Sequence, residues 1–314
     1  MSSGRLQSHS MVDDNPPPQL KELSKGIYAY VQLDGSWGLN NPGFIVGKKG
    51  VFLVDTCFTE HRSRALKAAI TSVTDKPVRT IMNTHHHGDH TWGNYLYPEA
   101  TIVGHRLCRE ATIDTGLGVQ VFFPTANWGH IDVEPAFLTF EDELTMWVDD
   151  LRVEIKFVGP AHTTNDSIAW VPERKLLFSG DLVFNHCTPF IVQGSLQGHL
   201  RGLQRLRALQ PEVIVSGHGD VCGPEGIENA IAYLQFVQQS AQAAWDAGLT
   251  PIQAAKKADL GRFGEWHEKE RFVANLHRAF SEIRGEPLGT PLALQDVMAE
   301  MIEMNDGQPL RCLA

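Results

Sequence analysis

The chain has 314 residues, of which 42% are hydrophobic and 20% are charged, and its formal net charge is −10. This composition excludes a disordered protein, and the length suits one large domain or two smaller ones. The negative charge and the lack of a lysine or arginine cluster argue against nucleic acid or an anionic membrane surface as a partner. The longest apolar stretches fall far short of a membrane span.

The five cysteines are scattered and include no C-x-x-C pair. This spacing disfavours a disulfide framework and favours reduced thiols in a cytosol. The N-terminal segment is rich in Ser, Gly, Gln and Pro and lacks the apolar core of a signal peptide. We therefore expect a cytoplasmic protein in which residues 1–22 form a disordered tail, with 1–10 a remnant of a cloning vector.

From residue 26 the chain alternates and is rich in β-branched residues, which predicts strands. The Gly-Lys-Lys-Gly sequence at 47–50 separates two apolar runs and predicts a hairpin. Apolar residues at helical spacing predict a helix over 62–73, and strands are expected at 78–83 and 101–104.

Strand patterns dominate residues 136–184, and a buried strand is expected at 212–219. Helices are predicted at 196–209 and 226–247, and the segment 249–303 is helical without a strand pattern. Strands thus dominate the first two-thirds of the chain and helices follow. This order favours a layered α/β fold over a purely parallel βαβ array.

The sequence NTHHHGDHTWGN follows one of the predicted strands directly. Within six residues it contains His85, His87, Asp89 and His90. Imidazole and carboxylate ligands suit zinc, and also iron or manganese. His85 and His87 are two residues apart, so both can point to the same side of an extended segment. Such a cluster at the carboxyl end of a strand favours a metal site over structural histidines.

Three further ligand-type residues follow later strand patterns: His162, Asp181 and His218. Each one alone would more often be a surface or core residue. Together, three strand segments that each deliver one ligand-type residue favour a shared metal site.

The order of these motifs, from Asp55 through H-x-H-x-D-H to His162, Asp181 and His218, resembles the signature of the metallo-β-lactamase superfamily. The resemblance covers about residues 25–222. It implies an α/β fold, the αββα sandwich, with a metal site at one edge between two sheets. We expect this domain at 23–224, with a helical C-terminal extension at 225–314 packed on it.

The resemblance also implies two zinc ions per chain and a role for each ligand-type residue. Transferred to this sequence, the ligands are His85, His87 and His162 for the first metal, Asp89, His90 and His218 for the second, and Asp181 for both. Asp55 would support the site from behind the ligands. Seven ligands for two metals leave open positions, as a catalytic site requires.

The implied function is a dinuclear zinc hydrolase in which hydroxide held by the metals attacks an ester-like, lactone, thioester or amide bond, β-lactams included. Asp89 or a water would protonate the leaving group. Glyoxalase II-like thioesterases, lactonases, lactamases and cyclase-like enzymes of biosynthetic clusters share these ligands, so the substrate stays open. Asp181 stands where the largest group of antibiotic-hydrolysing members has cysteine, which points away from that group.

The alternative is a mononuclear iron enzyme of the same fold, similar to a persulfide dioxygenase with two histidines and one aspartate. The complete second ligand set argues against it. RNA processing is opposed by the net charge. We expect a small-molecule substrate. The C-terminal helices could pack on the core, cap the pocket or form a homodimer contact.

Specificity in such folds comes from loops. Trp37 lies in a Gly- and Asn-rich loop at 34–43 that could overhang the site, and Phe122, Phe123 and Trp128 could form an apolar wall. The alternative is that these aromatic residues cover the core. His186, shortly after Asp181, could face the pocket or lie in a plain loop. His86 is expected to be a loop or supporting residue rather than a ligand.

Overall fold

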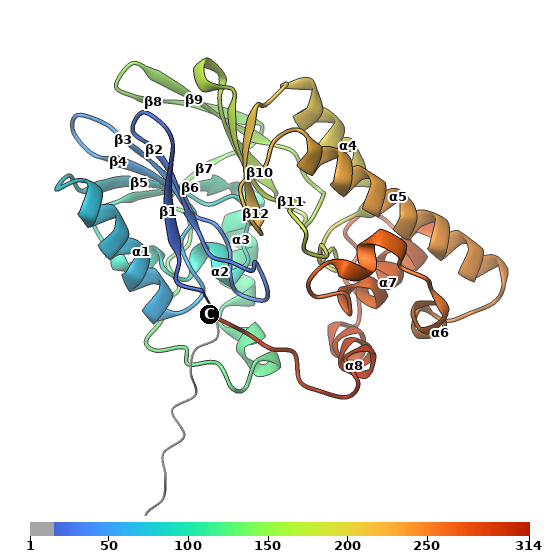
Figure 1. The fold of residues 1–314 in the computed structure, drawn as a ribbon. Coiled ribbons are helices and arrows are strands. Elements are labelled where there is room, and N and C mark those ends of the chain that lie inside the picture. The colour runs from blue at the N-terminus through green and yellow to red at the C-terminus, as the bar shows by residue number, and fades with distance from the viewer. Residues whose placement is uncertain (1–15) are drawn as a thin grey trace, which may run out of the picture.

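The computed structural model describes residues 16–314 and shows two β-sheets that stand face to face (Figure 1). The predicted vector remnant lies outside the described residues. The first sheet has the order β1-β2-β3-β4-β5-β6-β7. Its strands are Gln19–Ser24, Ile27–Val31, Gly43–Val46, Val51–Val54, Val78–Met82, Thr101–His105 and Leu138–Phe140.

The second sheet has the order β12-β11-β10-β9-β8. These strands, β8 to β12 in chain order, are Glu143–Val148, Leu151–Phe157, Ser167–Val171, Leu176–Phe184 and Val213–His218. Only β11 and β12 run parallel in this sheet. The mixed sheets confirm the α/β class expected from the strand and helix pattern.

Helices cover the outer faces of both sheets. The α-helices α1 to α8 are Glu60–Val73, Gly88–Thr91, Arg106–Thr115, Leu196–Ala208, Glu225–Asp246, Pro251–Lys257, Arg271–Ile283 and Leu294–Met304. Short 3₁₀ turns η1 to η4 lie at Asn94–Leu96, Gly118–Phe122, Pro172–Arg174 and Gly261–Glu265. In Figure 1, α1 lies outside the first sheet and α4 and α5 lie outside the second, so the layers are those of an αββα sandwich.

The two faces of a strand explain this layering. In β4, Phe52 and Val54 point into the core between the sheets, whereas Val51 and Leu53 pack toward Leu66 of α1. Side chains alternate across a strand, so a strand that is apolar on both faces must be covered on both. The site therefore has a rigid support on each side.

The N-terminal strand corrects one expectation. Residues 19–22 were expected in the disordered tail, but β1 begins at Gln19 and pairs antiparallel with β2. Its side chains are only partly buried, because it is the edge strand of the sheet. An edge strand needs little apolar sequence, which is why this segment looked like a tail. The hairpin at 47–50 is confirmed, since Gly47 N donates to Gly50 O over 2.9 Å.

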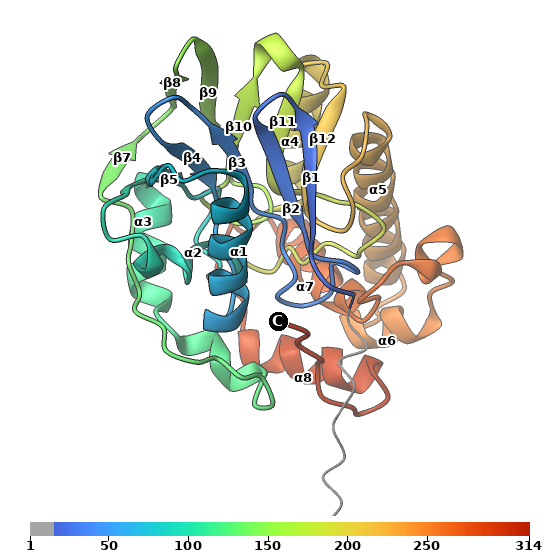
Figure 2. The ribbon, with the colours of Figure 1, turned by 60° about the vertical axis from the view of Figure 1, so that its left-hand side comes forward.

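The helices after β12 form one packed group and return to the N-terminal half. Phe263, Trp266 and Phe272 are buried among them. The last residues cross back, where Leu313 N donates to Trp37 O over 3.2 Å (Figure 2). All five cysteines are free thiols. Within residues 16–314, every helix is too short or too polar to cross a lipid bilayer.

Candidate metal centre

The H-x-H-x-D-H segment leaves the end of β5 and turns into the short helix α2. His87 is the N-cap residue of α2, and Asp89 and His90 lie in its single turn. His85 and His90 are almost fully buried, with about 1% of each exposed. An extended segment followed at once by a helical turn brings side chains at irregular spacing to one point.

The other three predicted ligands come from the second sheet. His162 lies in the loop between β9 and β10, and His218 is the last residue of β12. Asp181 lies inside β11, where the pairing with β12 shifts at Gly180. A Cβ at position 217 would overlap Asp181 Oδ1, so glycine at this position is required for the carboxylate to reach the site.

The structure brings all seven predicted ligands together in two adjoining groups. The first group is His85, His87, His162 and Asp181, and the second is Asp89, His90 and His218. Asp181 contacts both groups, because its Oδ2 lies 3.2 Å from His162 Nε2 and its Oδ1 lies 3.2 Å from His90 Nε2. Asp89 Oδ2 lies 3.3 Å from His218 Nε2. This carboxylate-centred arrangement brings together two groups of side chains that could each hold a metal ion.

Hydrogen bonds outside the centre fix which ring nitrogen faces it. The acceptors are Gln193 Oε1 for His87 Nε2 at 2.7 Å, Asp55 Oδ2 for His90 Nδ1 at 2.8 Å and the Gly35 carbonyl for His218 Nδ1 at 3.0 Å. A ring that donates outward on one nitrogen presents the lone pair of the other inward. The rings of His87, His90 and His218 are therefore oriented as metal ligands.

Asp55 also anchors the start of the ligand loop. Its Oδ1 accepts from Thr84 N and its Oδ2 from Thr84 Oγ1, both over 2.8 Å. Asp55 adopts a positive φ of 60° immediately after β4, which turns the side chain toward His90. The carboxylate thus joins the loop backbone to one ligand and does not itself belong to either ligand group.

The buried polar atoms at the centre test whether metal ions fit. His85 Nε2, His90 Nε2 and Asp181 Oδ1 are buried and make no hydrogen bond among the described residues, although His90 Nε2 and Asp181 Oδ1 lie 3.2 Å apart. Unsatisfied buried groups are rare because they lose their hydration without compensation. Three such atoms in one cluster, in a set of nitrogen and oxygen donors, fit divalent metal ions.

Comparison with known proteins identifies the family. The model of the metallo-beta-lactamase superfamily matches residues 35–218, which include the whole metal centre. The chain belongs to this superfamily. It is 26% identical over 220 residues to a metallo-beta-lactamase type 2 from Bacteroides fragilis, covering 67% of this chain and 82% of that protein.

Two further comparisons name other proteins. Over 179 residues the chain is 31% identical to the alpha subunit of a 2,4-dinitroanisole O-demethylase from Nocardioides sp., covering 55% of this chain and 51% of that subunit. A solved metallo-beta-lactamase from Pontibacter korlensis superposes with a TM-score of 0.59 at 19% identity, covering 70% of this chain and 99% of that one. The superposition shows the shared fold.

Burial and neighbouring charges shift the pKa of the carboxylates and of the rings at this centre. Burial opposes ionisation of Asp181, but the neighbouring His90 and His218 rings hold the pKa of its carboxyl well below the usual range. Burial lowers the pKa of His85 and of His162 well below the ordinary value, so these rings are neutral. Burial acts in the same direction on His90 and His218, but the neighbouring Asp181 outweighs it and raises the pKa of His90 well above the ordinary value and that of His218 to about 9. These two rings therefore release a proton when a metal binds. Ionised carboxylates and neutral imidazoles are the forms that bind metal.

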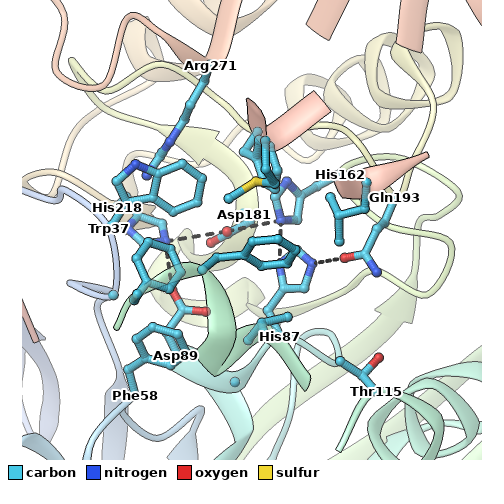
Figure 3. A pocket seen from close by; sticks show the side chains of 18 of the residues that line it. Trp37, Phe58, His87, Asp89, Thr115, His162, Asp181, Gln193, His218 and Arg271 are labelled. Atoms are coloured by element: carbon cyan, nitrogen blue, oxygen red, sulfur yellow. Dashed lines mark hydrogen bonds and ion pairs between the residues drawn. The ribbon is translucent and has the colours of Figure 1, made fainter. Parts of the chain in front are cut away.

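The pocket above the metal centre has aromatic walls (Figure 3). Of the residues expected there, Trp37, Phe122 and Phe123 line it. For the other two, Trp128 and His186, the structure agrees with the alternative given for each, a residue that packs on the core and a loop residue. Trp128 packs behind the wall, edge to face against Phe58 with 4.9 Å between ring centroids. His186 has a positive φ of 60° and its ring lies 6.5 Å from that of Trp266, outside the pocket.

Several pocket residues were missed by sequence reasoning. They are chiefly Phe58, Phe184, Phe190, Gln193, Arg271, Leu294 and Met298. Gln193 and Arg271 are polar residues in segments with no motif. Leu294 and Met298 belong to α8, whose apolar spacing predicts only a helix.

His86 lies in the loop that carries the H-x-H motif, as expected, and connects this loop to the loop that carries His162. Asn165 Oδ1 accepts from His86 N over 3.1 Å, and Asn165 Nδ2 lies 3.0 Å from His86 Nδ1. Next to it, Asp166 accepts from Thr163 N over 2.8 Å and so fixes the turn that carries His162. The loop with the H-x-H motif and the loop with His162 are therefore coupled directly.

Proposed function

We propose that this protein is a hydrolase that uses two zinc ions to cleave an ester-like, lactone, thioester or amide bond in a small molecule. The observation that carries the proposal is the pair of ligand groups that meet at Asp181, with unpartnered donor atoms turned toward the centre. Imidazole and carboxylate donors suit zinc. His85, His87 and His162 would hold one ion, Asp89, His90 and His218 the other, and Asp181 both.

Two metals bound there would acidify a water molecule and polarise the carbonyl of a substrate. The chain itself controls the position of charge and protons around them. Burial opposes ionisation of Asp89, but His90 and His218 lower the pKa of its carboxyl, and this side chain lines the pocket. An ionised Asp89 can accept a proton from attacking water and later return it to the leaving group.

The aromatic walls support a small organic substrate over a polymer. Trp37 lies 5.1 Å from Phe190 and 5.4 Å from Phe123, centroid to centroid, so the pocket is bounded by rings on several sides. Apolar walls exclude water, and exclusion of water strengthens the electrostatic interactions at the centre. The relatives named above include a metallo-beta-lactamase and a subunit of an O-demethylase, so the substrate panel below covers several kinds of bond.

The first test is elemental analysis of protein purified without added metal. We expect about two zinc ions per chain, lost on chelation and regained with zinc. One iron per chain would support the mononuclear dioxygenase instead, and protein that is active without metal would refute both. His186→Ala serves as a control, because its ring lies outside the pocket and its loss should leave metal content unchanged.

The second test is a substrate panel with thioesters, lactones, β-lactams, aryl esters and phosphoesters. Hydrolysis of at least one carbonyl substrate is expected to depend on zinc and on Asp89. If only phosphoesters are cleaved, the metal assignment can stand but the carbonyl chemistry is wrong.

A further inference from the structure

Arg271 is a buried cation that faces the same pocket as the metal centre. It is the first residue of α7 in the C-terminal extension, and about 1% of it is exposed. It lines the pocket together with Asp181 and His218. Figure 3 shows its side chain reaching down to Trp37 and toward His218.

The guanidinium is only partly satisfied. Nη1 donates to the Thr188 carbonyl over 3.0 Å, and Cζ lies 3.8 Å from the centroid of the Trp37 ring. Nε is buried without a hydrogen-bond partner. Within the described part of the chain, no carboxylate forms an ion pair with Arg271. Arg271 Nη2 likewise donates no hydrogen bond to any residue in that part of the chain.

The nearby acids are engaged elsewhere. Glu270 Oε1 accepts from Trp37 Nε1 over 3.1 Å. Burial raises the pKa of Glu268 to about 8 although Arg271 opposes the shift, so this carboxyl is mostly protonated at neutral pH. A buried cation without an ion-pair partner is costly, and an arginine fork matches the two oxygens of a carboxylate.

We propose that Arg271 binds an oxyanion of the substrate, in the simplest case a carboxylate, and so selects small apolar molecules that carry one negative group. The anion site is argued from the structure alone. The position of the cleaved bond relative to that site rests on the proposed function.

The aromatic rings set the spacing. Cζ of Arg271 lies 5.9 Å from the Phe184 centroid, and the Phe184 ring stacks on the His218 ring with centroids 4.9 Å apart and 3° between planes. One phenyl ring therefore lies between the guanidinium and a ligand of the metal centre. A substrate held by Arg271 would place its reactive bond about one ring away from its anionic group. The walls, which include Phe190 and Met298, would cover the apolar body between them.

A purely structural role is the competing explanation, because stacking on Trp37 could by itself hold the loop at 34–43. A pair of probes that differ only in charge separates the two roles. The probes are 4-fluorobenzoate and 4-fluorobenzamide, followed by fluorine NMR titration of the zinc-loaded protein. The variants are Arg271→Met and Arg271→Lys, with Arg262→Met as the control on an exposed arginine.

We expect wild type to bind the benzoate at least about tenfold more tightly than the benzamide, as one charge-assisted hydrogen-bonded pair provides. Arg271→Met should remove this preference and leave benzamide binding within about twofold, whereas Arg271→Lys and Arg262→Met should retain part and all of it, respectively. An equal loss for both probes, a preference that survives in Arg271→Met, or no benzoate binding to wild type would each overturn the proposal.

The same titration on metal-stripped protein separates this proposal from the proposed function. If Arg271 binds the anion, the preference for benzoate and its loss in Arg271→Met persist without metal. Failure of the zinc hydrolase hypothesis would then leave the anion site standing. If the preference disappears with the metal, benzoate is bound by the metal ions and Arg271 is not the anion site.

Discussion

The pocket has a floor, formed by the seven predicted metal ligands, and a C-terminal wall, which comprises Arg271, Leu294 and Met298 together with the adjoining Glu268. The two regions differ in which of their titratable groups are charged and how those charges are paired. On the floor, Asp181 is ionised because imidazoles surround it, and every predicted ligand lies in one of two compact groups. On the C-terminal wall, burial raises the pKa of Glu268 to about 8, and Arg271 has no ion-pair partner among the described residues. The floor thus gathers charges that suit metal ions, whereas the wall leaves one cation available to a ligand.

The two regions also differ in how their residues are held. Floor ligands come from strand ends and a short helical turn, and outward hydrogen bonds fix His87, His90 and His218. Wall residues such as Met298 come from helices that follow the sandwich and pack mainly through apolar contacts. Changes in the floor should therefore act first on metal binding, and changes in the wall on substrate binding and stability.

The largest effect is expected for Asp181→Ala. Because Asp181 contacts both ligand groups, its removal should lower metal content at both positions and abolish turnover. Asp89 belongs only to the second ligand group, so Asp89→Ala should lose about one metal per chain. Elemental analysis checks both variants, with circular dichroism to show that they fold. If Asp181→Ala keeps two metals and full activity, Asp181 is not the shared ligand.

A smaller loss is expected for Asp55→Ala, which removes the partner of His90 Nδ1 without removing a ligand. Outer partners of metal ligands typically contribute about 10–100-fold in metal affinity or activity. A competitive zinc titration should show a loss in this range, concentrated on the second metal. A variant that cannot fold would show that Asp55 acts mainly through its two bonds to Thr84.

Gln193→Leu should have a weaker effect on the first metal. Gln193 Oε1 accepts from His87 Nε2 and so favours the His87 tautomer with a free Nδ1. Gln193 also lines the pocket, so it contacts both a metal ligand and the pocket interior. We expect a loss of zinc affinity of roughly tenfold, near the low end for outer partners. Gln193→Glu keeps an acceptor and should retain most of the affinity. An unchanged titration for Gln193→Leu would place Gln193 in the wall alone.

The smallest effect concerns stability and pH at the wall. The folded-state pKa of Glu268 is raised to about 8, so its contribution to stability is complete below the unfolded value near 4.5 and is lost as pH rises toward 8. Glu268→Gln keeps the shape without the charge. Its melting temperature relative to wild type should therefore be higher at pH 8.5 than at pH 5. A constant difference across this range would mean that Glu268 is ionised in the folded protein.

The floor could be predicted from the sequence because its chemistry is local. His85 to His90 lie in one short segment, and the later ligands follow strands that the apolar pattern reveals. The role of Asp55 follows only from the resemblance to the metallo-β-lactamase signature. What the sequence could not supply is how each ring is oriented, since Gln193 and Gly35 are not adjacent in the chain to the rings that they contact.

The wall could not be predicted for the opposite reason. Arg271 stands at an ordinary helix start, and its burial depends on packing against Trp37, more than 200 residues earlier. Trp128 and Phe123 are both aromatic residues of the same irregular segment, yet of the two only Phe123 lines the pocket. Trp128 packs instead against Phe58 and Trp92. Composition indicates an aromatic wall, but tertiary packing decides which rings form it.

The most direct test of the proposed two-metal centre is a crystal structure of the zinc-loaded protein with anomalous data at the zinc edge. Two anomalous peaks are expected on either side of the Asp181 carboxylate, roughly 3.5–4 Å apart as in other two-metal sites. One peak should lie among His85, His87 and His162, and the other among Asp89, His90 and His218. A single peak at full zinc loading, or two peaks away from Asp181, would contradict the dinuclear centre.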